Sequence, residues 1–149
     1  MSPLSNSISE AKSGLLERFD NAYEYRSALQ DLWSPPSDDE SLVIAVGEFT
    51  FFKRKQPEPN TWSIAFTPTF KKSVADMDKK LQGRILAAIA DLSETPIGIR
   101  GDTIKPLVGE YKGLWRYRLG DYRLVYEPCE EKHVVVLLEF GARSGVYEG

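Results

Sequence analysis

The feature that most constrains the fold is a pair of alternating apolar and polar runs on either side of Gly120-Asp121. Glycine followed by aspartate between two such runs favours a two-residue β-hairpin turn with glycine in first place. That turn sets Arg118 opposite Arg123, and directly opposed residues share one face of a sheet. One face is therefore predicted to belong to a core, formed by Trp115, Tyr117, Leu119, Tyr122, Leu124 and Tyr126.

The opposite face of this hairpin carries Arg116, Arg118 and Arg123. Like charges directly opposite one another destabilise a sheet by up to about 1 kcal/mol. Their presence indicates a site for an anion, and the planar guanidinium suits phosphate because it donates two parallel hydrogen bonds. The alternative is a solvated face whose arginines are neutralised by acids placed elsewhere in the fold, and the hairpin alone leaves both interpretations open.

The chain around the hairpin predicts a small α+β domain. A short strand is expected at 62–66, and Thr67-Pro68 is typical of a helix N-cap followed by proline in the first turn. Apolar residues then recur at helical spacing, namely Phe70, Val74, Met77, Leu81, Ile85, Ile89 and Leu92. This spacing predicts either one long helix or two packed helices divided near Asp78 and Gly83. After a loop at 97–113, strands are expected at about 114–119, 122–128 and 133–140, so the fold class is a small antiparallel sheet packed against a helical hairpin.

An N-terminal helix-plus-strand appendage is expected before this domain. Ser7 and Glu10 form a capping-box pattern, and a broad apolar stripe then predicts one helix that ends at Ser34, before two prolines. Residues Leu42–Lys55 predict a strand or hairpin. We therefore expect an appendage at 1–55, an extended linker at 56–61 and a domain at 62–149, with the appendage packed on that domain because its apolar faces need a partner surface.

Composition excludes several classes of function. The 149 residues include 19 Lys and Arg against 22 Asp and Glu, and this net charge of −3 is not typical of a nucleic-acid binder. The acidic excess lies in residues 1–61, which hold 6 basic and 10 acidic side chains, whereas residues 62–149 hold 13 and 12. Cys129 and His133 are the only Cys and His residues, so a Cys/His zinc site is excluded. No signal-peptide pattern or membrane-length apolar run occurs, so a cytoplasmic location without membrane contact is expected.

The back half of the chain resembles the RelE/ParE toxin superfamily of bacterial toxin–antitoxin systems, and most closely its RelE branch. The resemblance spans about residues 62–149, through the order of a strand, two helices and a glycine-rich loop. It rests on three motifs, which are Lys105-Pro106-Leu107-Val108-Gly109, the hairpin from Trp115 to Tyr126, and Gly141-Ala142-Arg143 with Val146-Tyr147.

This resemblance implies a ribosome-dependent endoribonuclease that cuts mRNA in the ribosomal A site without metal or other cofactor. In such toxins the 2′-hydroxyl of the message attacks the adjacent phosphate. Carried over to this chain, the family's pattern implies transition-state stabilisation by Arg123 and Arg143, phosphate binding by Arg116 and Arg118, and base stacking or proton transfer by Tyr147. His133 is a weaker candidate for a general base, because it begins a strand after an exposed turn.

Two other functions compete with this one. A ParE-like gyrase inhibitor would share the fold without RNA chemistry, and a catalytically silent toxin fold would serve only as a binding protein. The resemblance also implies an antitoxin as partner, either a separate chain or residues 1–55 acting in cis. We expect the appendage to extend the sheet by edge pairing through Leu42–Lys55, and to restrain the toxin by enlarging it rather than by covering the arginines.

Overall fold

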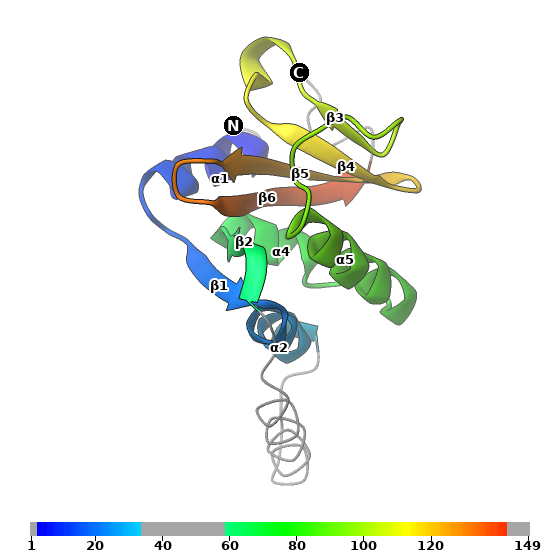
Figure 1. Ribbon diagram of the computed structural model, residues 1–149. Coiled ribbons are helices and arrows are strands. Elements are labelled where there is room, and N and C mark those ends of the chain that lie inside the picture. The colour runs from blue at the N-terminus through cyan, green and yellow to red at the C-terminus, as the bar shows by residue number, and fades with distance from the viewer. Residues whose placement is uncertain (1–2, 34–58, 143–149) are drawn as a thin grey trace, which may run out of the picture.

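The computed structural model describes residues 3–33 and 59–142 (Figure 1). In chain order its elements are α1 (Pro3–Lys12), β1 (Glu17–Asn21), α2 (Ala22–Trp33), β2 (Pro59–Phe66), α4 (Pro68–Val74), α5 (Lys79–Leu92), β3 (Ile104–Pro106), the 3-10 helix η1 (Gly109–Tyr111), β4 (Trp115–Leu119), β5 (Tyr122–Cys129) and β6 (Val134–Ala142). This arrangement confirms the α+β class. Across the described residues, no helix is long and apolar enough to cross a membrane.

The described strands form one six-stranded sheet in the order β1-β2-β6-β5-β4-β3. Its neighbouring strands are antiparallel except for β2 and β6, which are parallel. The sheet expected to be antiparallel is therefore mixed, because this one pair runs parallel. A parallel pair needs a long crossover, and the chain between β2 and β6 contains the two helices α4 and α5 and the β3–β5 meander.

The hairpin between β4 and β5 has the predicted register. Leu119 pairs with Tyr122, Arg118 with Arg123, and Trp115 with Tyr126. Gly120 adopts a φ of 61°, which suits the first position of a glycine-first turn. The aromatic and aliphatic face of the hairpin packs into the larger core, as predicted, with Tyr126 buried and Trp115 half-buried.

Two helices follow β2, so the two-helix alternative is confirmed. The Thr67 hydroxyl accepts a hydrogen bond from the Phe70 amide at 3.0 Å and caps α4. The Asp78 carboxylate accepts one from the Leu81 amide at 2.8 Å and caps α5. Gly83 lies inside α5 and does not interrupt it.

The single N-terminal helix expected up to Ser34 is wrong, because the chain divides there into α1, β1 and α2. Gly14 adopts a φ of 83°, and the chain turns after α1 into the edge strand β1, which pairs with β2. Phe19 then packs on Phe66 with ring centroids 4.6 Å apart. The apolar spacing of this segment matched a helix. Pairing of β1 with β2 instead satisfies the backbone hydrogen bonds and still packs Phe19 against the core.

The capping box expected at Ser7 and Glu10 is also wrong, since both residues lie inside α1. The Ser7 hydroxyl lies 2.5 Å from the Thr67 hydroxyl and donates to the Leu138 carbonyl at 2.6 Å. The Glu10 carboxylate accepts a hydrogen bond from the Thr69 amide at 2.9 Å. Both side chains thus serve tertiary contacts instead of the helix end.

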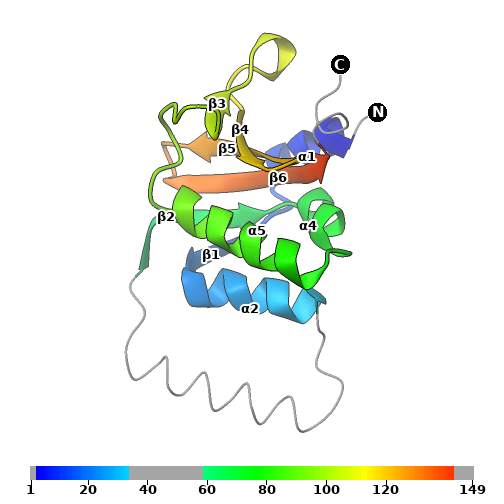
Figure 2. The ribbon, with the colours of Figure 1, turned by 90° about the vertical axis from the view of Figure 1, so that its right-hand side faces the viewer.

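The sheet is covered on both faces. The larger core joins one face to α2, α4 and α5, through residues such as Tyr25, Leu29, Phe70 and Ile89. On the opposite face Leu4 of α1 packs in a second cluster, which also contains Ala65, Leu107, Leu114, Val125, Val134, Val136 and Leu138. Figure 2 shows α1 on one side of β6 and the other three helices on its other side.

Three further expectations concern boundaries. The loop expected at 97–113 contains β3 and η1, since β3 pairs with β4 at the sheet edge. The linker expected at 56–61 overlaps β2, which begins at Pro59. The strand or hairpin predicted at Leu42–Lys55 lies outside the described residues.

Candidate anion-binding site

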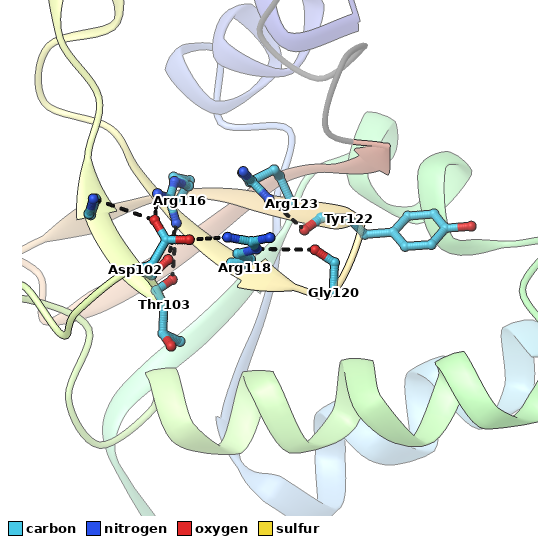
Figure 3. Close-up of polar contacts among 8 residues, drawn as sticks. Asp102, Thr103, Arg116, Arg118, Gly120, Tyr122 and Arg123 are labelled. Carbon is cyan, nitrogen blue, oxygen red and sulfur yellow. Dashed lines mark hydrogen bonds and ion pairs between the residues drawn. The ribbon is translucent and has the colours of Figure 1, made fainter.

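The structure brings Arg116, Arg118 and Arg123 together on one face of the β4–β5 hairpin. Arg118 lies directly opposite Arg123 in the register, and Arg116 precedes Arg118 by two residues on β4. In Figure 3 these side chains and α1 lie on one side of the strands, with α5 on the other. The other two predicted site residues, Arg143 and Tyr147, lie outside the described residues.

Asp102, in the turn before β3, joins two of these arginines (Figure 3). Its Oδ1 lies 3.0 Å from Arg116 Nη2 and 3.4 Å from Lys105 Nζ, and its Oδ2 accepts a hydrogen bond from Arg118 Nη1. Hydrogen bonds from Arg118 and Arg116 hold the pKa of this carboxyl well below its usual range. The hairpin alone left open that acids elsewhere in the fold neutralise the arginines. Asp102 does so in part, because it pairs with Arg116 and Arg118.

Backbone carbonyl groups orient both arginines independently of the Asp102 carboxylate. Arg116 Nη1 donates to the Asp102 carbonyl oxygen at 2.5 Å and to that of Thr103 at 3.5 Å. Arg118 Nε donates to the Gly120 carbonyl oxygen at 3.2 Å. Each guanidinium is thus held by one nitrogen and presents another to an anion.

Arg123 is more enclosed than a solvated polar face would make it, with only 3% of its surface exposed. Its Nη1 donates to the Tyr122 carbonyl oxygen at 3.4 Å, whereas its buried Nε has no hydrogen-bond partner among the described residues. A buried guanidinium nitrogen without a partner is costly, which is a property expected of a group that receives a ligand.

Glu139 is a further candidate residue that the sequence pattern did not predict. It pairs with Val125, two residues along β5 from Arg123, so it lies on the arginine face. A register shift near Val125 leaves Leu138 and Glu139 on the same face of β6. Glu139 is 7% exposed, its Oε1 has no partner among the described residues, and burial raises its pKa to about 7. The signal that could have found it is a single carboxylate in an otherwise apolar central strand.

His133 stands apart from this cluster. It precedes β6, whereas Glu139 lies near the other end of that strand. Its ring stacks on Trp62 with centroids 4.1 Å apart, and its backbone has a φ of 58°. The structure therefore gives His133 a packing contact and does not place it beside the arginines.

Most of the α+β fold, with the arginine hairpin, lies within the part of the chain that matches a known family. Residues 64–147 match the family described as "ParE toxin of type II toxin-antitoxin system, parDE". The chain therefore belongs to the RelE/ParE superfamily of type II toxin–antitoxin toxins.

Among individual proteins, the chain is similar to Toxin RelG of Mycobacterium tuberculosis. The two are 34% identical over 91 residues, which is 58% of this chain and 95% of RelG. Solved structures that resemble it include the toxin–antitoxin complex RelBE2 of the same organism, at 33% identity over 58% of this chain and 100% of the matched chain, with a TM-score of 0.43. The archaeal RelE–RelB complex from Pyrococcus horikoshii matches at 26% identity over 54% of this chain and 93% of its own, with a TM-score of 0.46.

Proposed function

We propose that this toxin is an mRNA endoribonuclease that acts on the ribosome, in the cytoplasm. The observation that carries the proposal is the composition of one sheet face, where three arginines on two paired strands accompany the buried carboxylate of Glu139, whose Oε1 has no hydrogen-bond partner among the described residues. Cations there suit a phosphate whose negative charge grows during reaction. The carboxylate supplies a proton acceptor, which arginines cannot.

The reaction proceeds through the RNA's own 2′-hydroxyl. Glu139 takes the proton as the 2′-oxygen bonds to phosphorus, and a pKa near neutrality suits this role. The bond from phosphorus to the 5′-oxygen breaks, and that oxygen leaves as a hydroxyl after receiving a proton, for which Tyr147 is the proposed donor. The products are a 2′,3′-cyclic phosphate and a 5′-hydroxyl. Arg123 and Arg143 stabilise the pentavalent phosphate, and Arg116 and Arg118 bind phosphate.

The test is Arg123→Ala in a translation reaction, read as mRNA fragments phased with the codons. Loss of one preorganised donor lowers the cleavage rate by about 10²–10³-fold. Because Arg123 is buried, Arg123→Gln serves as a second variant of similar size, and circular dichroism checks the fold. Arg26→Ala is the matched control, since it removes the same charge from an exposed position on α2. Cleavage by a folded Arg123 variant at the wild-type rate would contradict the assignment.

Gyrase inhibition is the second candidate, because the matching family is that of ParE toxins. The same preparation is therefore added to gyrase and supercoiled plasmid. Cleaved DNA without mRNA fragments favours this alternative, and neither product favours a catalytically silent binding protein.

We further propose that the N-terminal segment restrains the toxin in cis. Support comes from α1, whose Leu4 packs on the sheet face that carries the arginines, and whose Ser7 bonds the carbonyl of Leu138, next to Glu139. The strand β1 also extends the sheet at its β2 edge. Related structures contain a toxin with its antitoxin as a complex, so a separate antitoxin chain is the alternative partner. The position of α1 favours covering of the site over the enlargement expected from sequence.

A further inference from the structure

We propose that Lys105, Arg116 and Arg118 form a phosphate subsite that the side chain of Asp102 occupies in the free protein. The inference rests on the proposed function, because the displacing ligand is a phosphate of the RNA backbone. It adds Lys105 to the groups that bind RNA and makes Asp102 their internal competitor.

The charges in this subsite are unequal. Three cations converge on a single carboxylate, which leaves a surplus of two positive charges. Arg116 and Lys105 share the same oxygen, at 3.0 and 3.4 Å, while Arg118 takes the other. A planar carboxylate thus offers two oxygens to three cations. The oxygens of a phosphate form a tetrahedron and can meet cations that approach from three directions.

The two arginines are held in place without the carboxylate. Arg116 keeps its hydrogen bonds to the carbonyl oxygens of Asp102 and Thr103, and Arg118 keeps its bond to Gly120, when the Asp102 side chain rotates away. The nitrogens that face the carboxylate, Nη2 of Arg116 and Nη1 of Arg118, then become free for a ligand. A subsite oriented in advance by the backbone binds its anion with little reorganisation.

Asp102 is also easy to displace. Its side chain is 50% exposed, so water solvates the carboxylate as soon as it leaves. Its pairs with Arg118 and Lys105 are exposed on both sides, and such exposed ion pairs contribute little to stability. A groove of about 400 Å³ adjoins the subsite, since Lys105, Arg116 and residues 106–111 line it, and it offers room for the RNA next to the bound phosphate.

The experiment uses Asp102→Asn in the full chain, with inorganic phosphate and a 2′-O-methylated RNA trinucleotide as probes, measured by calorimetry at low salt. Both probes are expected to bind about tenfold tighter than to wild type, with a steeper salt dependence for RNA. Lys105→Ala in the Asp102→Asn background should reverse the gain. Asp31→Asn is the matched control, since it makes the same charge change at an exposed position on α2.

Unchanged or weaker binding of both probes by Asp102→Asn would overturn the inference, since Asp102 would then serve only to hold the arginines. A gain for inorganic phosphate alone would overturn the assignment to RNA. Cleavage is scored separately on ribosome-bound mRNA. Tighter RNA binding without cleavage would support the subsite and contradict the proposed nuclease activity. Cleavage with no gain in binding would support the nuclease activity and contradict the subsite.

Discussion

At the scale of single residues, the candidate site depends on polar groups that the fold encloses. Arg123 and Glu139 lie on one face of neighbouring strands, both buried, and each has an atom without a hydrogen-bond partner among the described residues. Such groups lower stability, because they lose hydration without replacing it. They are retained in a toxin whose proposed reaction needs a cation and a proton acceptor at one phosphate.

Glu139 gives this toxin a pH-dependent stability. The pKa is about 7 in the folded chain and 4.5 without burial, so the folded state binds the proton more tightly. The contribution of Glu139 to stability is therefore greatest below about pH 4.5, falls as the pH rises toward 7 and then stays constant. Glu139→Gln should match the wild type at about pH 4 and exceed it at pH 8 by about 2 kcal/mol in free energy of unfolding. Urea unfolding at both pH values measures this difference.

Glu127→Gln is the control for this prediction, because Glu127 is exposed on β5. It should change the free energy of unfolding by the same small amount at both pH values. Equal stability of Glu139→Gln and the wild type at pH 8 would show that Glu139 is solvated in solution.

At the scale of elements, local signals decide where helices begin and which strands pair. Thr67 and Asp78 each place a side-chain oxygen on an amide of the following turn, and this divides the apolar run after β2 into two helices. The edge strand β1 has no comparable local signal and exists through its pairing with β2.

The cap at Asp78 should therefore contribute measurably to the stability of α5. Asp78→Ala removes the acceptor of the Leu81 amide and should lower the free energy of unfolding by about 1 kcal/mol, whereas Asp78→Ser should keep most of it. Thermal or urea unfolding measures the loss. Asp76→Ala, in the preceding turn, removes the same charge outside the cap position. An equal loss in both variants would assign the effect to charge and not to the cap.

At the scale of the whole molecule, the N-terminal segment contributes to both cores, and its helix α1 packs on the sheet face that carries the arginines. Tyr25 and Leu29 of α2 are fully buried in the larger core, and Leu4 of α1 is fully buried on the arginine face. Removal of the whole segment would therefore open both cores, so restraint is better tested by loosening α1 alone.

The double variant Ser7→Ala with Glu10→Ala removes the polar contacts of α1 with Thr67, Leu138 and Thr69 while leaving Leu4 in place. Three hydrogen bonds at about 1 kcal/mol each should raise the population with α1 undocked, and mRNA cleavage with it, by about tenfold or more. Hydrogen exchange of the α1 amides checks the loosening. Lys12→Ala, at the exposed end of α1, is the control. Faster exchange with unchanged cleavage would contradict restraint by α1.

The sequence by itself determined those features whose causes are local. A glycine-first turn sets the register of β4 and β5, and with it the face shared by the three arginines. Oxygen-bearing side chains at Thr67 and Asp78 begin the two helices. Each of these depends on residues within a few positions of one another, so the pattern contains the whole interaction.

Only the tertiary structure decided what surrounds the arginines. Asp102 accepts a hydrogen bond from Arg118, 16 residues later in the sequence, and Ser7 donates one to Leu138, 131 residues later. Glu139 loses its hydration because other elements cover its strand. The prediction of a single N-terminal helix was wrong for the same reason. The pairing of β1 with β2, about 45 residues later, outweighed the local apolar periodicity. Contacts between distant residues depend on packing of the whole chain, and no local spacing encodes them.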